Sequence, residues 1–318
     1  MLLVKIDNDN NLNDLVSISI NQVGKYLVFD SKDEKKLQGL NYISVPDGIN
    51  YPLAYKQKDN LSNVNFGGEV LEKNKPIMIA GPCATESYEQ IDETASFMSS
   101  LGIKYFRSGN FKPRTNAYSF QGMEREGLEI CREVCDKYGL KLVSEVKDLS
   151  NFDDVQELAD IVQVGSKCMY DVGVLREVGR QDKSVLLKRH FGATLIEFVQ
   201  AADFILCQGN ENLTLCERGI RSFENSTRFT LDSSGIEWLK YHTWLPIIGD
   251  PSHAMGHRYG IFGLSMGILA QGVNGLIIEV HPNPESAKSD SNQQLSFEEF
   301  KNLYNKYKKF STFLNDIY

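Results

Sequence analysis

Side chains that commonly bind metal ions follow short apolar runs at several distant points of the chain. A cysteine comes after Gly-Pro, a histidine closes an Asp-Pro-Ser-His segment, a glutamate ends an apolar run and an aspartate lies in the segment behind it: Cys83, His253, Glu279 and Asp290. A thiolate, an imidazole and two carboxylates suit Mn²⁺, Fe²⁺, Co²⁺ or Zn²⁺ better than Mg²⁺ or Ca²⁺. Each residue alone could equally be structural, so the site depends on whether the fold brings them together.

Cationic side chains gather at or just after the same kind of apolar run, and they are Arg107, Lys112, Arg114, Lys167, Lys188, Arg189, Arg218 and Arg258. The chain as a whole carries a formal net charge of −8. Unpaired charges in a cleft are costly, so this concentration predicts a ligand with phosphate or carboxylate groups. In the alternative, some of these cations pair with Glu145, Glu217 or Glu224. Arg189 and Arg221 are the best candidates for such ion pairs.

The segment 109–122, with the sequence GNFKPRTNAYSFQG, is rich in small and polar residues and is long for a loop between a strand and a helix. Lys112, Arg114 and Thr115 lie around Pro113 in this loop. Cationic and hydroxyl side chains grouped in this way predict a phosphate clamp.

These residues need a scaffold that brings distant strand ends together. From residue 75 onward, eight β-type runs alternate with segments of helical period, such as 86–100, 125–138 and 193–206. The expected strands are 77–81, 105–109, 141–146, 161–165, 184–189, 214–219, 245–250 and 275–280. This alternation and length predict an α/β fold, a (β/α)8 TIM barrel whose functional residues lie at the carboxyl ends of the strands. An open doubly wound sheet is the alternative fold.

The first part of the chain has a different pattern. Short strand-like pieces at 2–6, 15–20, 26–29 and 42–45 are broken by Asn, Asp and Gly, and a polar, turn-rich linker is expected over 57–68. We therefore divide the chain into a small β-rich N-terminal extension, residues 1–65, and a catalytic barrel, residues 66–318. The extension could serve as a regulatory lid, an oligomer contact or a packing element.

Composition excludes several classes of function. A sequence pI near 5.3 argues against broad contact with nucleic acid, which relies on surplus Lys and Arg. The sequence begins without a charged leader ahead of a long apolar stretch, and no window approaches the ~20 apolar residues that cross a bilayer. The 6 cysteines form no CxxC pair and favour a reducing compartment. We expect a cytoplasmic protein without a membrane or nucleic-acid partner.

Taken together, the segments from about residue 75 to the end resemble a known family. They are similar to 3-deoxy-D-arabino-heptulosonate 7-phosphate (DAHP) synthase of the type I-beta subgroup, which opens the shikimate pathway towards the aromatic amino acids. The resemblance rests on IAGPCATES, FKPRTNAYSFQG, LLKR, LCERGIR, TRFTLD, DPSHAMGHR and EVHPNPESAKSD.

The resemblance implies a metal-dependent transferase that condenses phosphoenolpyruvate with erythrose 4-phosphate and releases phosphate. It implies a metal on Cys83, His253, Glu279 and Asp290, which polarises the aldehyde or orients water. The residues matched to phosphoenolpyruvate are Arg107, Lys112, Lys167, Lys188 and Arg218, while those matched to the erythrose 4-phosphate phosphate are Arg114 and Thr115. Asp250 is expected to bind the aldose, and Glu145 to handle water or to pair with an arginine. The residues expected to be catalytic are Cys83, Lys112, Asp250 and His253.

Two departures keep an alternative open. Lys167 stands where the family usually has an arginine, and Asn116-Ala117 replaces a common Ser-Pro. The alternative is the same chemistry on another aldose phosphate, as in octulosonate 8-phosphate synthase or in a homologue of specialised metabolism. A non-catalytic sensor barrel is a third hypothesis, although all four metal-type residues are present.

We further expect a homo-oligomer, either a dimer or a tetramer, and a chorismate mutase is a candidate partner. The extension is short for the regulatory domain usual in the family. The sequence therefore predicts weak or absent feedback inhibition by Tyr or Phe.

Overall fold

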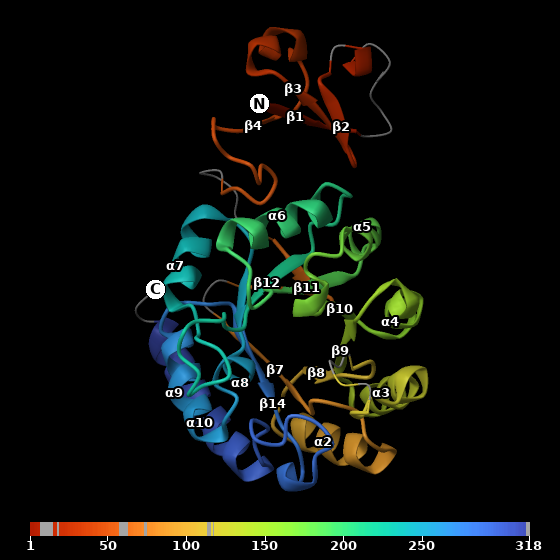
Figure 1. Ribbon diagram of the computed structural model, residues 1–318, viewed down its shortest axis with the longest axis vertical. Helices are drawn as coiled ribbons and strands as arrows, with labels where there is room; N and C mark the ends of the chain where they lie inside the picture. Colours follow the sequence, from red (N-terminus) through yellow and green to blue (C-terminus); the bar gives the residue numbers. More distant parts are fainter. Residues whose placement is uncertain are drawn as a thin grey trace.

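The computed structural model describes residues 1–6, 15–17, 19–56, 63–72, 75–112, 116 and 118–315. Its main body is a closed barrel of eight parallel strands surrounded by helices (Figure 1). The strands are β7 (Ile77–Gly81), β8 (Tyr105–Ser108), β9 (Lys141–Val146), β10 (Ile161–Val164), β11 (Ser184–Lys188), β12 (Leu213–Glu217), β13 (Ile247–Gly249) and β14 (Gly275–Glu279). Each overlaps one of the expected strands, so the predicted TIM barrel is confirmed.

The barrel closes between the last strand and the first. β14 pairs in parallel with β7, and Glu279 stands opposite Gly81 at the carboxyl ends of the two strands. β13 pairs with β14 on the other side. The segments that follow β7, β13 and β14 therefore start beside one another, although they are far apart in the sequence.

The helices that cover the barrel are α2 (Tyr88–Ser100), α3 (Glu124–Tyr138), α4 (Phe152–Leu158), α5 (Val172–Arg180), α6 (Leu195–Leu206), α7 (Ser233–His242), α8 (Pro251–Met255), α9 (Arg258–Leu269) and α10 (Phe297–Asn315). Local sequence signals mark their ends. Thr194 and Glu197 form a capping box at the start of α6, and Gly139 ends α3 in the left-handed conformation. The expected helices at 86–100, 125–138 and 193–206 correspond to α2, α3 and α6.

The N-terminal part forms a separate four-stranded sheet of order β2-β3-β1-β4, which lies outside the ring of helices in Figure 1. Its strands are β1 (Leu2–Lys5), β2 (Asn21–Val23), β3 (Tyr26–Phe29) and β4 (Ile43–Ser44). The 3₁₀ helix η1 (Ser31–Leu37) follows β3. This sheet agrees with the β-rich character of the extension, while the division at residue 65 stays a prediction.

The expected strand at 15–20 is wrong. Residues 15–17 are helical, and the Ser19 amide donates to the Leu15 carbonyl at 3.0 Å, which is a helical contact. Leu15 packs against the core of the extension from this helical turn. A short apolar run does not distinguish a strand from a helical turn by period alone, and the run lies next to residues 7–14, which are outside the described residues.

A two-stranded hairpin closes the amino-terminal end of the barrel. It consists of β5 (Asn65–Phe66) and β6 (Glu69–Val70), so the expected linker at 57–68 is wrong at its end, whereas 57–62 lie outside the described residues. Phe66 is fully buried and packs edge-on against Tyr105 inside the barrel. Ser184 Oγ donates to the Asn65 carbonyl at 2.9 Å. An apolar residue of this turn-rich segment is thus a core residue of the barrel.

A second segment attaches the extension to the side of the barrel. Leu53 and Ala54 donate their backbone amides to the carboxylate of Asp203 on α6, at 3.2 and 2.7 Å. The indole of Trp244 donates to the Leu53 carbonyl at 2.6 Å. Burial raises the pKa of Asp203 to about 7, although the two amides act in the opposite direction. Asp203 is therefore a buried anchor for the chain between the two parts.

None of the described helices combines the length and the apolar character that crossing a bilayer needs.

Candidate active site

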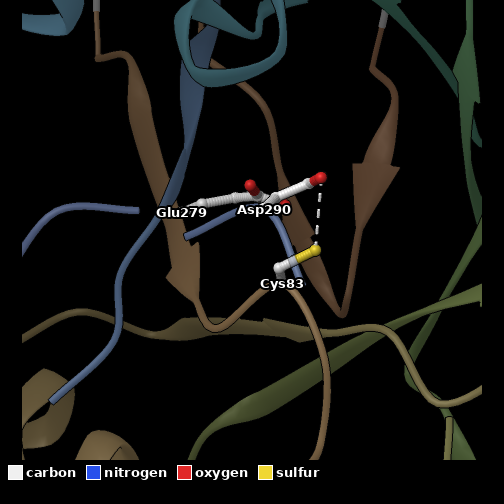
Figure 2. A group of neighbouring side chains, drawn as sticks. All are labelled: Cys83, Glu279 and Asp290. Carbon is white, nitrogen blue, oxygen red and sulfur yellow. Dashed lines mark hydrogen bonds between the residues drawn. The ribbon is translucent and has the colours of Figure 1, made fainter. Parts of the chain in front are cut away.

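Three of the predicted metal ligands lie together at the carboxyl end of the barrel. Cys83 follows β7, Glu279 ends β14 and Asp290 lies in the segment after β14, and one donor atom from each falls within 4.8 Å of the others (Figure 2). Cys83 Sγ is 3.5 Å from Asp290 Oδ2. We call these three residues the ligand cluster.

His253 lies beside the ligand cluster in the short helix α8. Its Nε2 atom is 3.5 Å from Glu279 Oε1, and its Nδ1 atom is 2.7 Å from Asp250 Oδ2. Asp250 caps α8 by accepting the His253 backbone amide at 3.0 Å. All four residues selected by the sequence are thus at one place, while their role as ligands stays a prediction.

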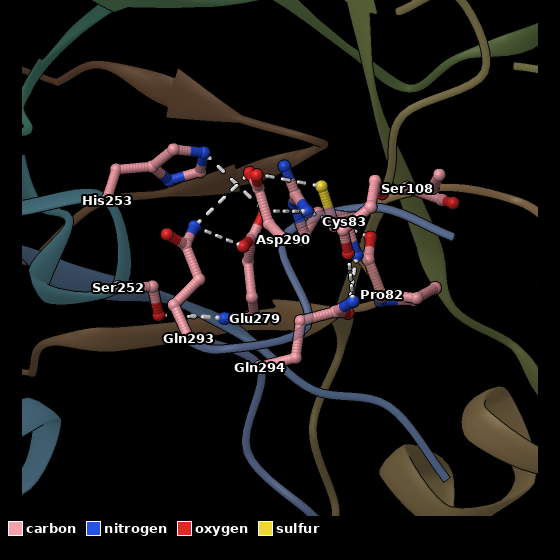
Figure 3. A network of polar contacts seen from close by, with 12 residues as sticks. Pro82, Cys83, Ser108, Ser252, His253, Glu279, Asp290, Gln293 and Gln294 are labelled. Atoms are coloured by element: carbon pink, nitrogen blue, oxygen red, sulfur yellow. Dashed lines mark hydrogen bonds and ion pairs between the residues drawn. The ribbon is translucent and has the colours of Figure 1, made fainter. Parts of the chain in front are cut away.

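Two adjacent glutamines, which sequence reasoning missed, form hydrogen bonds with the ligand cluster (Figure 3). Gln293 Nε2 donates to Glu279 Oε2 at 2.6 Å and lies 3.4 Å from Asp290 Oδ2. Gln294 Oε1 accepts the Cys83 backbone amide at 2.8 Å. Both glutamines are buried. Their only signal in the sequence was their place just after Asp290.

The charges of the ligand cluster suit a bound cation. Burial favours the neutral form of Asp290, but the positive charges around it, Arg228 first, together outweigh burial and hold the pKa of Asp290 well below its ordinary value. For Glu279, the charges of His253, Arg107 and Lys112 together outweigh burial in the same way and lower the pKa. Burial, with Glu279 next, raises the pKa of the Cys83 thiol to about 12. Two carboxylates, an imidazole and a thiol that a cation would deprotonate fit a transition metal of the predicted type.

A cavity of about 310 Å³ opens beside this cluster, with His253 and Asp290 in its wall. The cations that line it are Arg107, Lys112, Lys167, Lys188, Arg218, Arg221 and Arg228. Glu145 also lines the cavity, and its carboxylate accepts a hydrogen bond from Gln163. Six of the predicted substrate-binding residues therefore face one space. The remaining two, Arg114 and Thr115, lie outside the described residues.

Some of these cations are held by the residues of the ligand cluster and its neighbours. Arg107 Nη1 donates to Glu279 Oε1 at 2.9 Å, and Lys188 Nζ donates to Asp250 Oδ2 at 2.6 Å. Both side chains are almost fully buried. A negatively charged ligand would lie on the side of these cations that faces the cavity. Among the lining residues, Glu145 and Asp290 carry the carboxylates that could compete with it.

Arg218 differs from the other cations. Its side chain is buried, its Nη1 atom has no hydrogen-bond partner among the described residues, and its guanidinium lies 4.1 Å above the ring centre of Phe229. Burial lowers the pKa of Arg218, with Asp250 as the largest opposing charge. A buried donor without a partner is costly, so an anion in the cavity would satisfy it.

The ion-pair alternative holds for part of the predicted set. Arg189 pairs with Glu217 and Asp232, each at 2.8 Å, and is a structural residue. Arg258 pairs with Glu285 and does not line the cavity. Arg221 makes no ion pair within the described residues and lies over the ring of Phe191 instead, so the expectation of an ion pair is wrong for it. The aromatic partner of Arg221 left no signal in the sequence, because Phe191 follows β11 whereas Arg221 follows β12.

Comparison with known proteins places this geometry in a family. A sequence profile of the DAHP synthetase I family matches residues 58–315. The phospho-2-dehydro-3-deoxyheptonate aldolase of Thermotoga maritima is 47% identical over 232 residues, which cover 73% of this chain and 69% of that protein. The chain belongs to the DAHP synthetase I family. The predicted family is therefore confirmed, and its type I-beta subgroup is consistent with these matches.

Solved structures agree with this membership of the DAHP synthetase I family. A phospho-2-dehydro-3-deoxyheptonate aldolase of Thermotoga maritima superposes with a TM-score of 0.82 and 36% identity, covering 98% of this chain and 97% of that one. A truncated form of the Thermotoga maritima synthase gives a TM-score of 0.77 and 40% identity, covering 83% and 97%. The 2-dehydro-3-deoxyphosphooctonate aldolase of Francisella tularensis subsp. holarctica is 29% identical over 231 residues, covering 67% of this chain and 83% of that protein.

Proposed function

We propose that this member of the DAHP synthetase I family condenses phosphoenolpyruvate with erythrose 4-phosphate to give DAHP and inorganic phosphate. The reaction is the first step of the shikimate pathway. The observation that carries the proposal is the contact between the ligand cluster and a cavity lined by cations, in which Arg218 keeps a buried donor without a partner.

The cavity would bind phosphoenolpyruvate through its two anionic groups. Arg218, Lys188 and Lys167 approach from the carboxyl ends of neighbouring strands and would bind the phosphate, while Arg107 and Lys112 would bind the carboxylate from the side of the ligand cluster. Arg supplies paired donors and Lys a point charge, so the two residue types fix both orientation and charge. Arg114 and Thr115 are proposed for the phosphate of the aldose.

In the reaction, carbon 3 of phosphoenolpyruvate attacks the aldehyde, water adds at carbon 2 and the phosphate leaves by C–O cleavage. Lys112 Nζ is proposed as the proton donor to the former aldehyde oxygen. Asp250 would bind an aldose hydroxyl, and Glu145, which lines the cavity, would accept a proton from the water.

Cys83, His253, Glu279 and Asp290 would hold a divalent metal of the Mn²⁺, Fe²⁺, Co²⁺ or Zn²⁺ class. When bound, such an ion supplies Lewis acidity towards the aldehyde oxygen or the water. The donor set and the depressed carboxylate pKa values support this assignment.

A second aldose phosphate is the alternative, because Lys167 and Asn116 depart from the usual family pattern. The relative with the heptonate name is 47% identical, whereas one with the octonate name is 29% identical, which weighs against the alternative. We also keep as proposals a cytoplasmic location, a homo-oligomer and a chorismate mutase partner.

A coupled assay tests the proposal. Protein loaded with Mn²⁺ is incubated with phosphoenolpyruvate and a panel of four- and five-carbon aldose phosphates, and phosphate and the 3-deoxyulosonate product are measured before and after chelation. We expect turnover to be fastest with erythrose 4-phosphate and to be lost with chelator. Faster turnover with arabinose 5-phosphate would support the alternative, and no product with any aldose would refute both.

A further inference from the structure

Two arginines and two phenylalanines form a continuous stack in the wall of the cavity. Arg218 Cζ lies 4.1 Å from the ring centre of Phe229, and Arg221 Cζ lies 4.4 Å from the ring centre of Phe191. The two rings stack on each other, with centres 5.3 Å apart and 20° between their planes. All four residues line the cavity. We call them the cation–aromatic stack.

The backbone is arranged to assemble this stack from two loops. Phe191 follows β11, and its carbonyl accepts the Arg221 amide at 2.7 Å. The other three members lie in the loop after β12, which folds back on itself because Ile220 and Thr230 exchange two hydrogen bonds of 2.9 Å. This pairing brings Phe229 next to Arg218.

Gly219 permits the close approach of the two ends of that loop. Its φ is +92°, and a Cβ atom there would lie 2.8 Å from Phe229 Cβ. Any larger residue would meet both the backbone strain of the left-handed region and the contact with Phe229. Glycine at position 219 therefore allows Phe229 to lie beside Arg218.

The phenylalanine rings of the stack orient the two arginines without neutralising their positive charge. Arg107 is paired with Glu279, Arg228 with Asp290 and Arg189 with Glu217, so each of these cations already has a carboxylate partner. A phenylalanine ring attracts a guanidinium through its π face and takes up none of its N–H donors. Within the described residues, Arg218 therefore keeps both a full charge and the unpartnered Nη1 donor.

We infer that Phe229 and Phe191 are positioning residues for the anionic substrate, because they orient Arg218 and Arg221 towards the cavity as cations without a carboxylate partner. Arg218 contacts the phosphate or carboxylate, and Arg221 adds a second positive charge at the outer end of the stack. The identity of the ligand as phosphoenolpyruvate depends on the proposed function. The stack itself defines a site for a small dianion.

The test compares four variants of the metal-loaded enzyme, of which Phe191→Leu removes the second ring of the stack. Phe229→Leu removes the aromatic face, Phe229→Tyr keeps it, and Phe223→Leu changes a fully exposed phenylalanine of the same loop as the matched control. The dissociation constant of phosphoenolpyruvate is measured by calorimetry without aldose, and kcat and KM are measured with both substrates.

A desolvated cation–π contact predicts about a tenfold loss of phosphoenolpyruvate affinity in Phe229→Leu. The KM for phosphoenolpyruvate should rise by a similar factor, while kcat and the KM for erythrose 4-phosphate change by less than about twofold, because only the binding of phosphoenolpyruvate is weakened. Phe229→Tyr should restore the affinity, and Phe223→Leu should match the unchanged enzyme. Phe191→Leu should weaken binding by a smaller factor.

Three results would overturn the inference: an unchanged affinity in Phe229→Leu, an equal loss in Phe229→Tyr, or a loss confined to kcat. If Phe229→Leu does not fold, Phe191→Leu and Gly219→Ala test the same stack. The calorimetry separates this inference from the proposed function, because an enzyme that binds phosphoenolpyruvate but forms no heptulosonate would refute the function and still report on the stack.

Discussion

The ammonium nitrogen of Lys112 lies 3.1 Å from the sulfur of Cys83 and 2.8 Å from the carbonyl oxygen of the same residue. Burial opposes the charge of Lys112, but the negative groups around it, Cys83 first, raise its pKa above the ordinary value. Lys112 also lines the cavity. The Lys112 side chain thus connects the ligand cluster with the cavity, so a substrate bound through Lys112 must lie next to the Cys83 thiol.

Removal of the thiol should abolish metal binding without unfolding the barrel. Cys83→Ala deletes one member of the ligand cluster, and we expect metal affinity to fall more than about 100-fold, beyond the effect of losing an indirect contact. Metal content after dialysis and circular dichroism measure the two effects. Cys135→Ala, a buried cysteine of α3, is the control and should keep its metal. Equal metal content in both variants would contradict the assignment of Cys83.

Loss of the Gln293 side-chain amide should weaken metal binding although all four proposed ligands remain. Gln293→Leu leaves Glu279 Oε2 without its donor, and we expect metal affinity to fall by about 10- to 100-fold. Competition with a fluorescent chelator measures the affinity. The neighbouring Asn292 is exposed, so Asn292→Leu should bind metal as the unchanged protein does. Similar affinities for the two variants would mean that Gln293 has no positioning role.

The buried Arg189–Glu217 ion pair should make a large contribution to the free energy of unfolding. Arg189→Met leaves the fully buried Glu217 without its cation and should reduce the free energy of unfolding by about 3–5 kcal/mol. Arg180→Met breaks an exposed pair with Glu177 and should cost less than about 1 kcal/mol. Urea unfolding measures both. An Arg189→Met variant as stable as Arg180→Met would indicate that the buried pair contributes little.

The anchor between extension and barrel should make stability depend on pH. The unfolded state loses the Asp203 proton near pH 3.8, whereas burial raises the pKa in the folded state to about 7. Between these values the folded state binds more protons, so this group lowers the free energy of unfolding as pH rises, by at most about 1.4 kcal/mol per pH unit, and has a constant effect above pH 7.

Asp203→Asn should remove this contribution, and urea unfolding at pH 5 and pH 7 measures it. Glu211→Gln, at an exposed ion pair with Lys5, is the control and should keep the slope of the unchanged protein. If Asp203→Asn and the unchanged protein have the same pH slope, the Asp203 carboxylate is ionised throughout this range.

The barrel was predictable because parallel strands buried on both faces appear as continuous apolar runs, such as 77–81 and 276–278. The polar residues that follow such runs had to converge once the barrel closed, which is why Cys83, Glu279 and Asp290 could be selected. In contrast, 15–17 was misassigned because its apolar residues satisfy a helical turn as well as a strand.

The fate of individual cations was predictable only in part from the sequence. Arg189 and Arg221 were both expected to form ion pairs, yet Arg189 meets Glu217 and Arg221 meets Phe191. The difference arises from how the loop after β12 folds back, which depends on Gly219 and on pairing between Ile220 and Thr230. Long-range loop geometry of this kind leaves no periodic signal.

Phe66 determines where the chain can be truncated, or its N-terminal part replaced, without opening the barrel interior. The ring fills the amino-terminal mouth of the barrel, together with Ile79, Ile161 and Ile277 from its inner wall. A fragment that starts at the first barrel strand would expose this apolar interior to water, whereas a fragment that starts before the hairpin would keep Phe66 to cover it. An upstream domain could therefore be exchanged by recombination only at a point before Asn65, ahead of the first barrel strand.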